Sequence, residues 1–343
     1  MSRAARTNED GTVLLSTLLV LALMSAVALG LMATVRHAVR AAQTTNETAQ
    51  ADLYADGAEH YARAVVASLG LLDGPVLNEA LLKAEPVLLP FDGGFINASV
   101  RDGTHCIRLS GLTDASGQAN QNEVLRLSAL MRALGLPTNE ASRLAATAAD
   151  WVDRDSVRAA NGAEDGPYLF RDPPHRTANV PFASPTELRA LDGMSEEVFQ
   201  LLRPHVCIGK AGTETKFNVD TMDARHLPVL AALTASEGDG MALAAEILAA
   251  RPRGGFGGET ALKTTVPSLQ DKDTVPTGFM IKSITYTPDR LVVEALIQFG
   301  TVERARVYGF ESIKAPEPEI TYRDWGRSAF QPVAAVSEEG EQP

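Results

Sequence analysis

The stretch Thr12–Val35 reads TVLLSTLLVLALMSAVALGLMATV and contains no charged residue. At about 1.5 Å per residue, a helix of this length reaches about 36 Å, enough to cross the hydrocarbon core of a membrane with some tilt. The polar sequence MSRAARTNEDG precedes it, and Gly11 stands at the polar-apolar junction. The apolar run is too long for the hydrophobic region of a secretory signal, and no A-x-A-type site follows it. The sequence therefore predicts either a simple N-terminal anchor or an anchor whose leader is removed after Gly11.

The helical pattern continues beyond this apolar stretch. No proline occurs between Arg36 and Leu72, and apolar residues recur near helical spacing from Leu53 to Leu69. We therefore predict one helix over 12–69. Its first half would lie in a membrane, and its second half would pack on a globular body.

The composition indicates a folded body behind this helix. The chain has 343 residues, of which 45% are hydrophobic and 22% charged, and this length allows two or three domains. The net charge of −12 argues against a nucleic-acid partner, because cations supply most of the affinity for phosphate, and it is compatible with divalent cations. The six histidines are scattered, and no G-x-S-x-G, S-x-x-K or H-E-x-x-H motif occurs, so we predict that the chain is not an enzyme.

Strand-like and helical segments alternate along the rest of the chain. We expect an irregular connection over 73–94, and then two short strands in 94–112 with a hairpin turn at Asp102-Gly103. The residues from 113 to 250 look almost wholly helical. Strands return at GFMIKSITYT, DRLVVEALIQFG and ERARVYGFESI, before a proline-containing tail. The order indicates an α+β fold with a helical domain inserted into it.

The junction at Gly11 and the helix behind it resemble the class III signal of type IV pilins and type II secretion pseudopilins. In those families a prepilin peptidase cuts after the glycine and methylates the new N-terminus. The resemblance implies that Thr12 becomes the first mature residue and that Ser16 occupies mature position five. Most pseudopilins have glutamate at that position, and its absence is a mark of the protein K family of the type II secretion system.

Several phrases, in their order along residues 11–310, are similar to the same family. They are TDASGQANQNEVLRL, DWVDRD, GAEDGPY, ANVPFASPTELRAL and FNVDT. Two features depart from the family pattern: the leader is not net basic, and the phrase usually written N-x-N-T is Asn218-Val219-Asp220-Thr221 here. The resemblance implies a pilin-like body, made of a long N-terminal α-helix plus an antiparallel sheet, with a large inserted all-α domain.

The resemblance also assigns the parts of the chain. They are a prepilin leader (1–11), a transmembrane or filament-core helix (12–35), the first part of the pilin-like body (36–112), the inserted α-helical domain (113–250), the C-terminal strands of the body (251–313) and a flexible tail (314–343). The implied location is the inner membrane, crossed once, with the body in the periplasm.

The function implied is that of a minor pseudopilin. It would cap the tip of the periplasmic pseudopilus and help to start its assembly, for export of folded proteins across the outer membrane. The partners implied are the minor pseudopilins I and J, the prepilin peptidase and the inner-membrane secretion platform, with the secretin and exoproteins as further candidates. The alternative is a minor pilin of a type IV pilus or DNA-uptake system, whose signal and helix would look alike.

An acidic cluster follows the DWVDRD phrase. Asp150 and Asp153 share one face of a predicted helix. Carboxylates that converge within about fifteen residues repel one another unless a cation lies between them, and hard oxygen ligands in a loop suit Ca²⁺. The residues alone favour a solvated acidic surface with helix caps. The resemblance implies calcium instead, because protein K members bind it in this domain, and the ligands we predict are Asp153, Asp155, Glu164 and Asp165. Weaker candidates, which turn and capping roles explain equally well, are Asp114, Gln118 and Asn120.

Two cysteines occur, Cys106 and Cys207, and they have no metal-ligand spacing. In an oxidising compartment they could form a disulfide. The alternative is a pair of separate buried thiols, and the sequence leaves both open.

The phrase TELRALDGMSEEVFQLL looks like a helix-hairpin-helix unit. Elsewhere this motif binds nucleic-acid backbone through glycine amides. Here four acidic residues accompany a single arginine, Arg189. We therefore interpret the unit as structural and expect no nucleic-acid partner.

Overall fold

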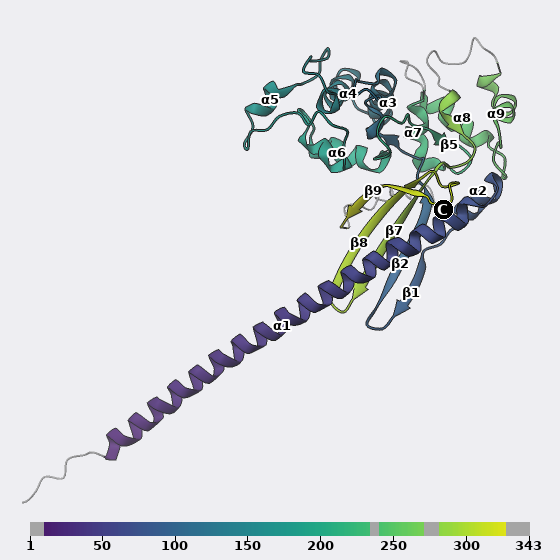
Figure 1. The fold of residues 1–343 in the computed structure, drawn as a ribbon. Coiled ribbons are helices and arrows are strands. Elements are labelled where there is room, and N and C mark those ends of the chain that lie inside the picture. The colour runs from purple at the N-terminus through teal and green to yellow at the C-terminus, as the bar shows by residue number, and fades with distance from the viewer. Residues whose placement is uncertain (1–9, 234–239, 271–280, 327–343) are drawn as a thin grey trace, which may run out of the picture.

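The computed structural model describes residues 10–233, 240–270 and 281–326. The first helix, α1 (Asp10–Gly70), confirms the prediction of one helix through the apolar stretch and into the body. Its N-terminal half projects away from the rest of the molecule (Figure 1). Within the described ranges it is the one helix long and apolar enough to cross a membrane, and its most apolar part is fully exposed. Most of the predicted leader lies outside the described residues.

A five-stranded antiparallel sheet packs against the second half of α1. In the order β1-β2-β7-β8-β9 its strands are β1 (Val87–Phe91), β2 (Gly94–Asp102), β7 (Arg290–Phe299), β8 (Val302–Glu311) and β9 (Glu319–Trp325). Small side chains line the helix face that meets the sheet, including the fully buried Ala51 and Ala55. These small side chains allow α1 to approach the sheet closely. The hydroxyl of Tyr308 in β8 donates to the carbonyl of Ala55 in α1 at 3.1 Å. The fold is therefore the α+β, pilin-like arrangement that was predicted.

Two predictions about this body are wrong. The segment 73–94 is not irregular, because it forms α2 (Gly74–Leu82) and the edge strand β1. The tail predicted from residue 314 contains β9, in which Tyr322 is buried. Pro316 and Pro318 lie in the connection before the strand, where no ladder hydrogen bond is lost. Residues 327–343 of that tail lie outside the described residues.

The inserted domain leaves and rejoins the sheet between two neighbouring strands. β2 pairs with β7, and Asp102 at the end of β2 lies opposite Leu291 near the start of β7. The chain between these points forms the helical region at the end of the sheet remote from the free half of α1 (Figure 1). The sequence predicts boundaries of 113–250 for this domain. In the structure, the described residues of 103–289 lie outside the five-stranded sheet, so the insertion begins earlier and ends later than predicted.

Helices are the main regular structure of the inserted domain, but irregular segments such as 153–164 and 170–184 contradict the prediction that 113–250 is almost wholly helical. Buried side chains such as Leu127, Leu144 and Leu230 belong to its apolar cluster. Its α-helices are α3 (Gln121–Ala133), α4 (Thr138–Val152), α5 (Asp165–Leu169), α6 (Glu196–Leu202), α7 (Leu227–Ala231), α8 (Gly240–Ala250) and α9 (Glu259–Thr265). Its 3₁₀ turns are η1 (Leu109–Gly111), η2 (Pro185–Ala190), η3 (Arg203–His205), η4 (Ala224–His226), η5 (Pro267–Leu269) and η6 (Ile281–Ser283). Four two-residue strands pair in parallel, β3 (Ile107–Arg108) with β4 (Val206–Cys207) and β5 (Phe217–Asn218) with β6 (Ile284–Thr285).

The predicted hairpin at Asp102-Gly103 is wrong. β2 already has β1 on one side and β7 on the other, so no edge remains for the residues that follow Gly103. The chain turns away instead, and β3 pairs with β4. The predicted strand GFMIKSITYT is wrong for the described part, which forms η6 and the short β6; its first residues lie outside the described ranges.

Candidate metal site and the neck of the inserted domain

Three acidic side chains converge just beyond the end of α4. Asp153 is the residue that ends this helix, and Asp155 and Glu164 lie in the loop between α4 and α5. One carboxylate oxygen from each lies within 4.8 Å of the other two. This spacing is compatible with one Ca²⁺ coordination sphere, because oxygens on opposite sides of a cation at about 2.3–2.6 Å are about 5 Å apart.

Two of these carboxylates are short of hydrogen-bond donors. Oδ1 of Asp153 and Oε1 of Glu164 are buried, and neither has a partner among the described residues. Burial, followed by repulsion from Asp155 and Asp150, raises the pKa of Asp153 to about 6. Burial is again the largest cause for Glu164, whose pKa is raised to about 7. Buried acceptors that face other carboxylates fit a bound cation, which would supply the missing positive charge.

The neighbouring Asp150 shapes the loop. Both of its carboxylate oxygens accept from the backbone amide of Ala159 at 3.2 Å. A Cβ on Gly162 would lie 2.1 Å from Oδ2 of Asp150, so glycine is required where the loop passes this carboxylate. Asp150 thus folds the loop back toward α4 and brings Glu164 beside Asp153.

The structure does not bring Asp165, the fourth predicted ligand, into this group. Its carboxylate faces the opposite segment, where it accepts from Arg176 at 3.1 Å and from the amide and hydroxyl of Thr177 at 3.1 and 3.0 Å. These bonds hold the chain after α5 in place. Asp165 therefore acts as a loop anchor in this structure.

The weaker candidates take turn and capping roles. The carboxylate of Asp114 accepts from the amide and hydroxyl of Ser116 and from the amide of Gln118. Asn120 caps α3 by accepting from the amide of Asn122 at 3.2 Å. Asp114 is not among the acidic side chains that converge at this point of the described structure.

A second polar cluster, which sequence reasoning missed, lies where the inserted domain meets the sheet. We call this region the neck and define it by the segments around Asp102, Cys106, Cys207 and Asn218. Asp102 is buried, and its carboxylate accepts four hydrogen bonds. The donors are the amide of Thr104 (2.8 Å), the hydroxyl of Thr104 (2.6 Å), the side-chain amide of Asn218 (2.8 Å) and the hydroxyl of Thr221 (2.6 Å). Asn218 also donates to Asn78 of α2 at 3.0 Å. The FNVDT phrase therefore joins the inserted domain to the body.

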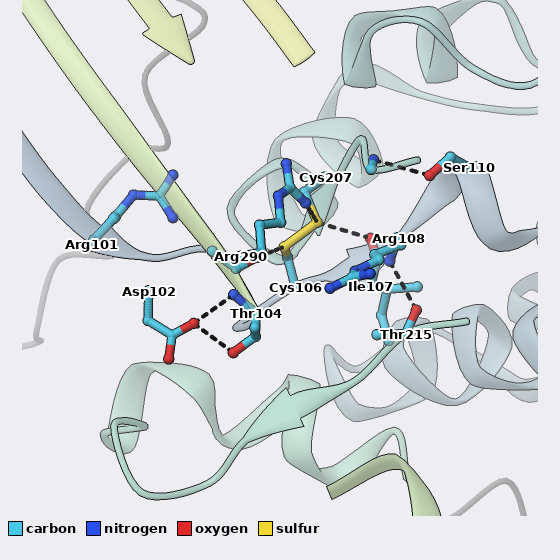
Figure 2. The surroundings of a disulfide bond; sticks show 12 residues. Arg101, Asp102, Thr104, Cys106, Ile107, Arg108, Ser110, Cys207, Thr215 and Arg290 are labelled. Atoms are coloured by element: carbon cyan, nitrogen blue, oxygen red, sulfur yellow. Dashed lines mark hydrogen bonds between the residues drawn. A yellow bond between two sulfur atoms is a disulfide. The ribbon is translucent and has the colours of Figure 1, made fainter. Parts of the chain in front are cut away.

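A disulfide between Cys106 and Cys207 closes the neck. Their Cα atoms are 5.8 Å apart, and 101 positions separate them in the sequence. The bridge links the segment that leaves the sheet after β2 to the parallel strand β4, and Arg290 lies beside it (Figure 2). The sequence left the pairing open because nothing local relates residues so far apart.

The residues predicted for processing lie on α1. Gly11 and Thr12 fall within its first turn, and the hydroxyl of Ser16 donates to the carbonyl of Val13 at 2.9 Å. A serine in this apolar segment thus satisfies its own polar group within the helix.

The predicted helix-hairpin-helix phrase forms η2 and α6, which flank Gly193 at a φ of 78°. The guanidinium of Arg143 occupies the space beside Gly193, where a Cβ would lie 2.2 Å from Nη1. Arg189 pairs with Glu196 at 2.7 Å and lies over the ring of Phe199 at 3.9 Å. These contacts engage Arg189, the basic side chain of the motif, within the protein itself. That the unit as a whole is structural stays an interpretation.

The fold defines a pilin-like protein with a membrane-length helix and a helical domain inserted between two strands. A family model described as Type II secretion system (T2SS), protein K matches residues 105–211. Protein K of Klebsiella pneumoniae is 32% identical over 273 residues, covering 78% of this chain and 82% of the relative. Protein K of Pseudomonas aeruginosa is 28% identical over 339 residues, covering 93% and 98%. The chain therefore belongs to the type II secretion system protein K family.

A solved structure supports the fold. A chain of the GspK-GspI-GspJ complex from the enterotoxigenic Escherichia coli type 2 secretion system superposes with a TM-score of 0.65 at 22% identity, covering 83% of this chain and 99% of that one. The matches place the chain among secretion-system pseudopilins, and they do not favour the alternative of a type IV pilus or DNA-uptake pilin.

Proposed function

We propose that this chain caps the tip of the periplasmic pseudopilus, in contact with pseudopilins of the I and J type. The observation that carries the proposal is the placement of the inserted domain at the end of the body remote from the free apolar half of α1 (Figure 1). A subunit stacked above it would meet this domain rather than an open helix face. The relative of known structure was crystallised with GspI and GspJ, which supports partners of the same kind here.

Ser16 supports the same role. In the usual assembly, glutamate at mature position five pairs with the N-terminal ammonium of the subunit above. An unpaired carboxylate inside a bilayer costs roughly 2.5–3.5 kcal/mol on insertion scales. A first subunit has no neighbour above it to relieve this cost, and Ser16 avoids it by donating within its own helix.

Crosslinking of assembled filaments tests the capping role. A crosslinkable residue on the exposed surface of the inserted domain should capture few partners, and one on the body side of α1 should capture I- and J-type pseudopilins. Ser16→Glu should lower incorporation at the tip, with Ser16→Ala as the matched control that keeps it. Recovery of this chain along the shaft at the abundance of the major pseudopilin would refute the role.

We further propose that the leader is removed between Gly11 and Thr12 by a prepilin peptidase, that the new N-terminus is methylated, and that the body lies in the periplasm. The support is the exposed apolar helix behind a glycine junction. Mass spectrometry of the chain from cells with and without the peptidase tests the processing. A full-length mass in wild-type cells would contradict it.

The convergence of Asp153, Asp155 and Glu164 supports the proposal that the inserted domain binds Ca²⁺. Calcium takes about six to eight oxygens, so loop carbonyls and water would complete the three carboxylates. The ion's role would be structural, since it would hold the α4–α5 loop closed.

Thermal unfolding with and without Ca²⁺ tests this site. Saturation at 100 times the dissociation constant should stabilise the wild type by about 2.7 kcal/mol. The double variant Asp153→Ala/Glu164→Ala should lose this stabilisation. Asp165→Asn is the matched control, because Asp165 faces Arg176 instead, and it should retain the stabilisation. An unchanged calcium response in the double variant would place the site elsewhere.

A further inference from the structure

A small cavity lies at the neck, between the sheet and the inserted domain. The disulfide forms part of its wall, and three arginines from separate segments line it: Arg101 of β2, Arg203 of η3 and Arg290 of β7. Much of the remaining lining is apolar, including Val292 and Val307. A cavity with cationic side chains in apolar surroundings attracts a small anion.

Arg290 is the cation for which the structure provides least compensation. Its side chain is 1% exposed. Its Nη1 donates to Sγ of Cys207 at 3.2 Å, a weak acceptor, and its buried Nε has no hydrogen-bond partner among the described residues. Figure 2 shows this guanidinium beside the disulfide.

The carboxylates around Arg290 and Arg203 are engaged by other groups. Glu294 accepts from Arg101 at 3.1 Å. Asp289 pairs with Arg108 at 2.9 Å. Glu311 accepts the backbone amide of Lys210 at 3.0 Å, and Asp324 accepts the hydroxyl of Tyr322 at 2.5 Å. The negative groups nearby therefore leave the Nε of Arg290 without an acceptor.

The backbone is shaped around this guanidinium. A Cβ on Gly309 of β8 would lie 2.9 Å from Nη2 of Arg290, and one on Gly103 would lie 2.9 Å from its Cγ. The pairing of β8 with β9 shifts register between Gly309 and Phe310, next to the same side chain. Two glycines and a bulge thus make room for a buried cation, whose burial is costly and which Glu311 and Asp289 compensate only through space.

We propose that this cavity binds a single chloride ion, held by the guanidinium of Arg290 with Arg101 and Arg203 around it. The cavity volume of about 20 Å³ exceeds the roughly 10–15 Å³ that one water-sized particle needs, so a monatomic anion fits. Burial, with repulsion from Arg108, lowers the pKa of Arg290 to about 10, and a bound anion would favour its charged form. The ion would join strands β2 and β7 to the neck beside the disulfide.

The test uses the full-length chain in detergent, unfolded thermally while chloride replaces gluconate at constant ionic strength. The melting temperature of the wild type should rise with chloride and reach a plateau, as expected for one saturable site. Arg290→Gln should lose this rise. Arg189→Gln is the matched control, because Arg189 pairs with Glu196 on the surface and does not line the cavity, and it should keep the rise.

Anomalous diffraction from wild-type crystals soaked in bromide gives a second readout that needs no variant. A bromide peak beside Nε of Arg290 is expected. Either the absence of a peak in this cavity or an equal chloride response in Arg290→Gln and the wild type would overturn the proposal.

Discussion

The buried carboxylate at the neck and the buried carboxylates in the loop between α4 and α5 differ in how many hydrogen-bond donors surround them. At the neck, the carboxylate of Asp102 accepts four hydrogen bonds from three residues. In the loop after α4, Asp153 and Glu164 each have a buried oxygen that lacks a partner in the described structure. A buried carboxylate with all its donors in place stabilises a fold, whereas converging carboxylates without donors are stable only with a cation or a proton.

This difference explains why the cluster around Asp102 connects the inserted domain to the sheet, whereas the cluster after α4 is a candidate metal site. The donors to Asp102 come from the segment after β2 and from the FNVDT phrase, so the carboxylate fixes the inserted domain on the sheet. The loop carboxylates come from one short stretch of chain and face one another. Removing a carboxylate should therefore be costly at the neck and should be tolerated, in the absence of metal, at the loop.

The largest effect is expected for Asp102→Ala. Four donors lose their acceptor, at about 1–3 kcal/mol each before relaxation, so the free energy of unfolding should fall by about 4–6 kcal/mol. Chemical denaturation measures it. Asp155→Ala without calcium is the matched control and should change stability far less. Equal losses in the two variants would remove the distinction between the clusters.

A smaller loss is expected when the neck disulfide is removed. Cys106→Ser/Cys207→Ser should destabilise the protein by about 2–4 kcal/mol, because the bridge no longer restricts the unfolded chain. Urea unfolding of the two forms gives this difference. Thiol labelling of the unfolded, unreduced wild type should find neither cysteine reactive, and two reactive thiols would show that the bridge does not form.

The smallest effect concerns the pH dependence of the calcium-free protein. The folded-state pKa values of Asp153 and Glu164, about 6 and about 7, are raised above their ordinary values. Between about pH 4 and pH 7 the folded protein therefore binds more protons at these groups, and their contribution to stability falls as pH rises.

Unfolding of Glu164→Gln at pH 5 and pH 8 checks this prediction. Its stability without calcium should fall less over that interval than the stability of the wild type. Calcium should reverse the wild-type trend, because the metal binds the deprotonated carboxylates. A calcium affinity that is higher at pH 5 than at pH 8 would count against these residues as ligands.

The sequence predicted the features that depend on neighbouring residues. The apolar run fixes α1, because an uncharged stretch of membrane length has a single favourable backbone conformation in lipid. The alternation in 290–311 predicts β7 and β8, and the spacing within one loop is enough to suggest that Asp153, Asp155 and Glu164 lie close together. Asp165 shows the limit of such reasoning, since it pairs with Arg176 although its neighbour Glu164 lies with Asp153 and Asp155.

Only the tertiary structure decided the features that join distant segments. Asp102 meets Asn218, Cys106 meets Cys207, and Arg290 is buried beside that bridge, each across more than eighty positions. No local pattern encodes such pairings, because they depend on how the inserted domain, which begins after β2 and ends before β7, packs against the sheet. The sequence by itself thus determined the long helix, the strands β7 and β8 and the family, whereas packing between the sheet and the inserted domain determined the edge strands β1 and β9 and the neck.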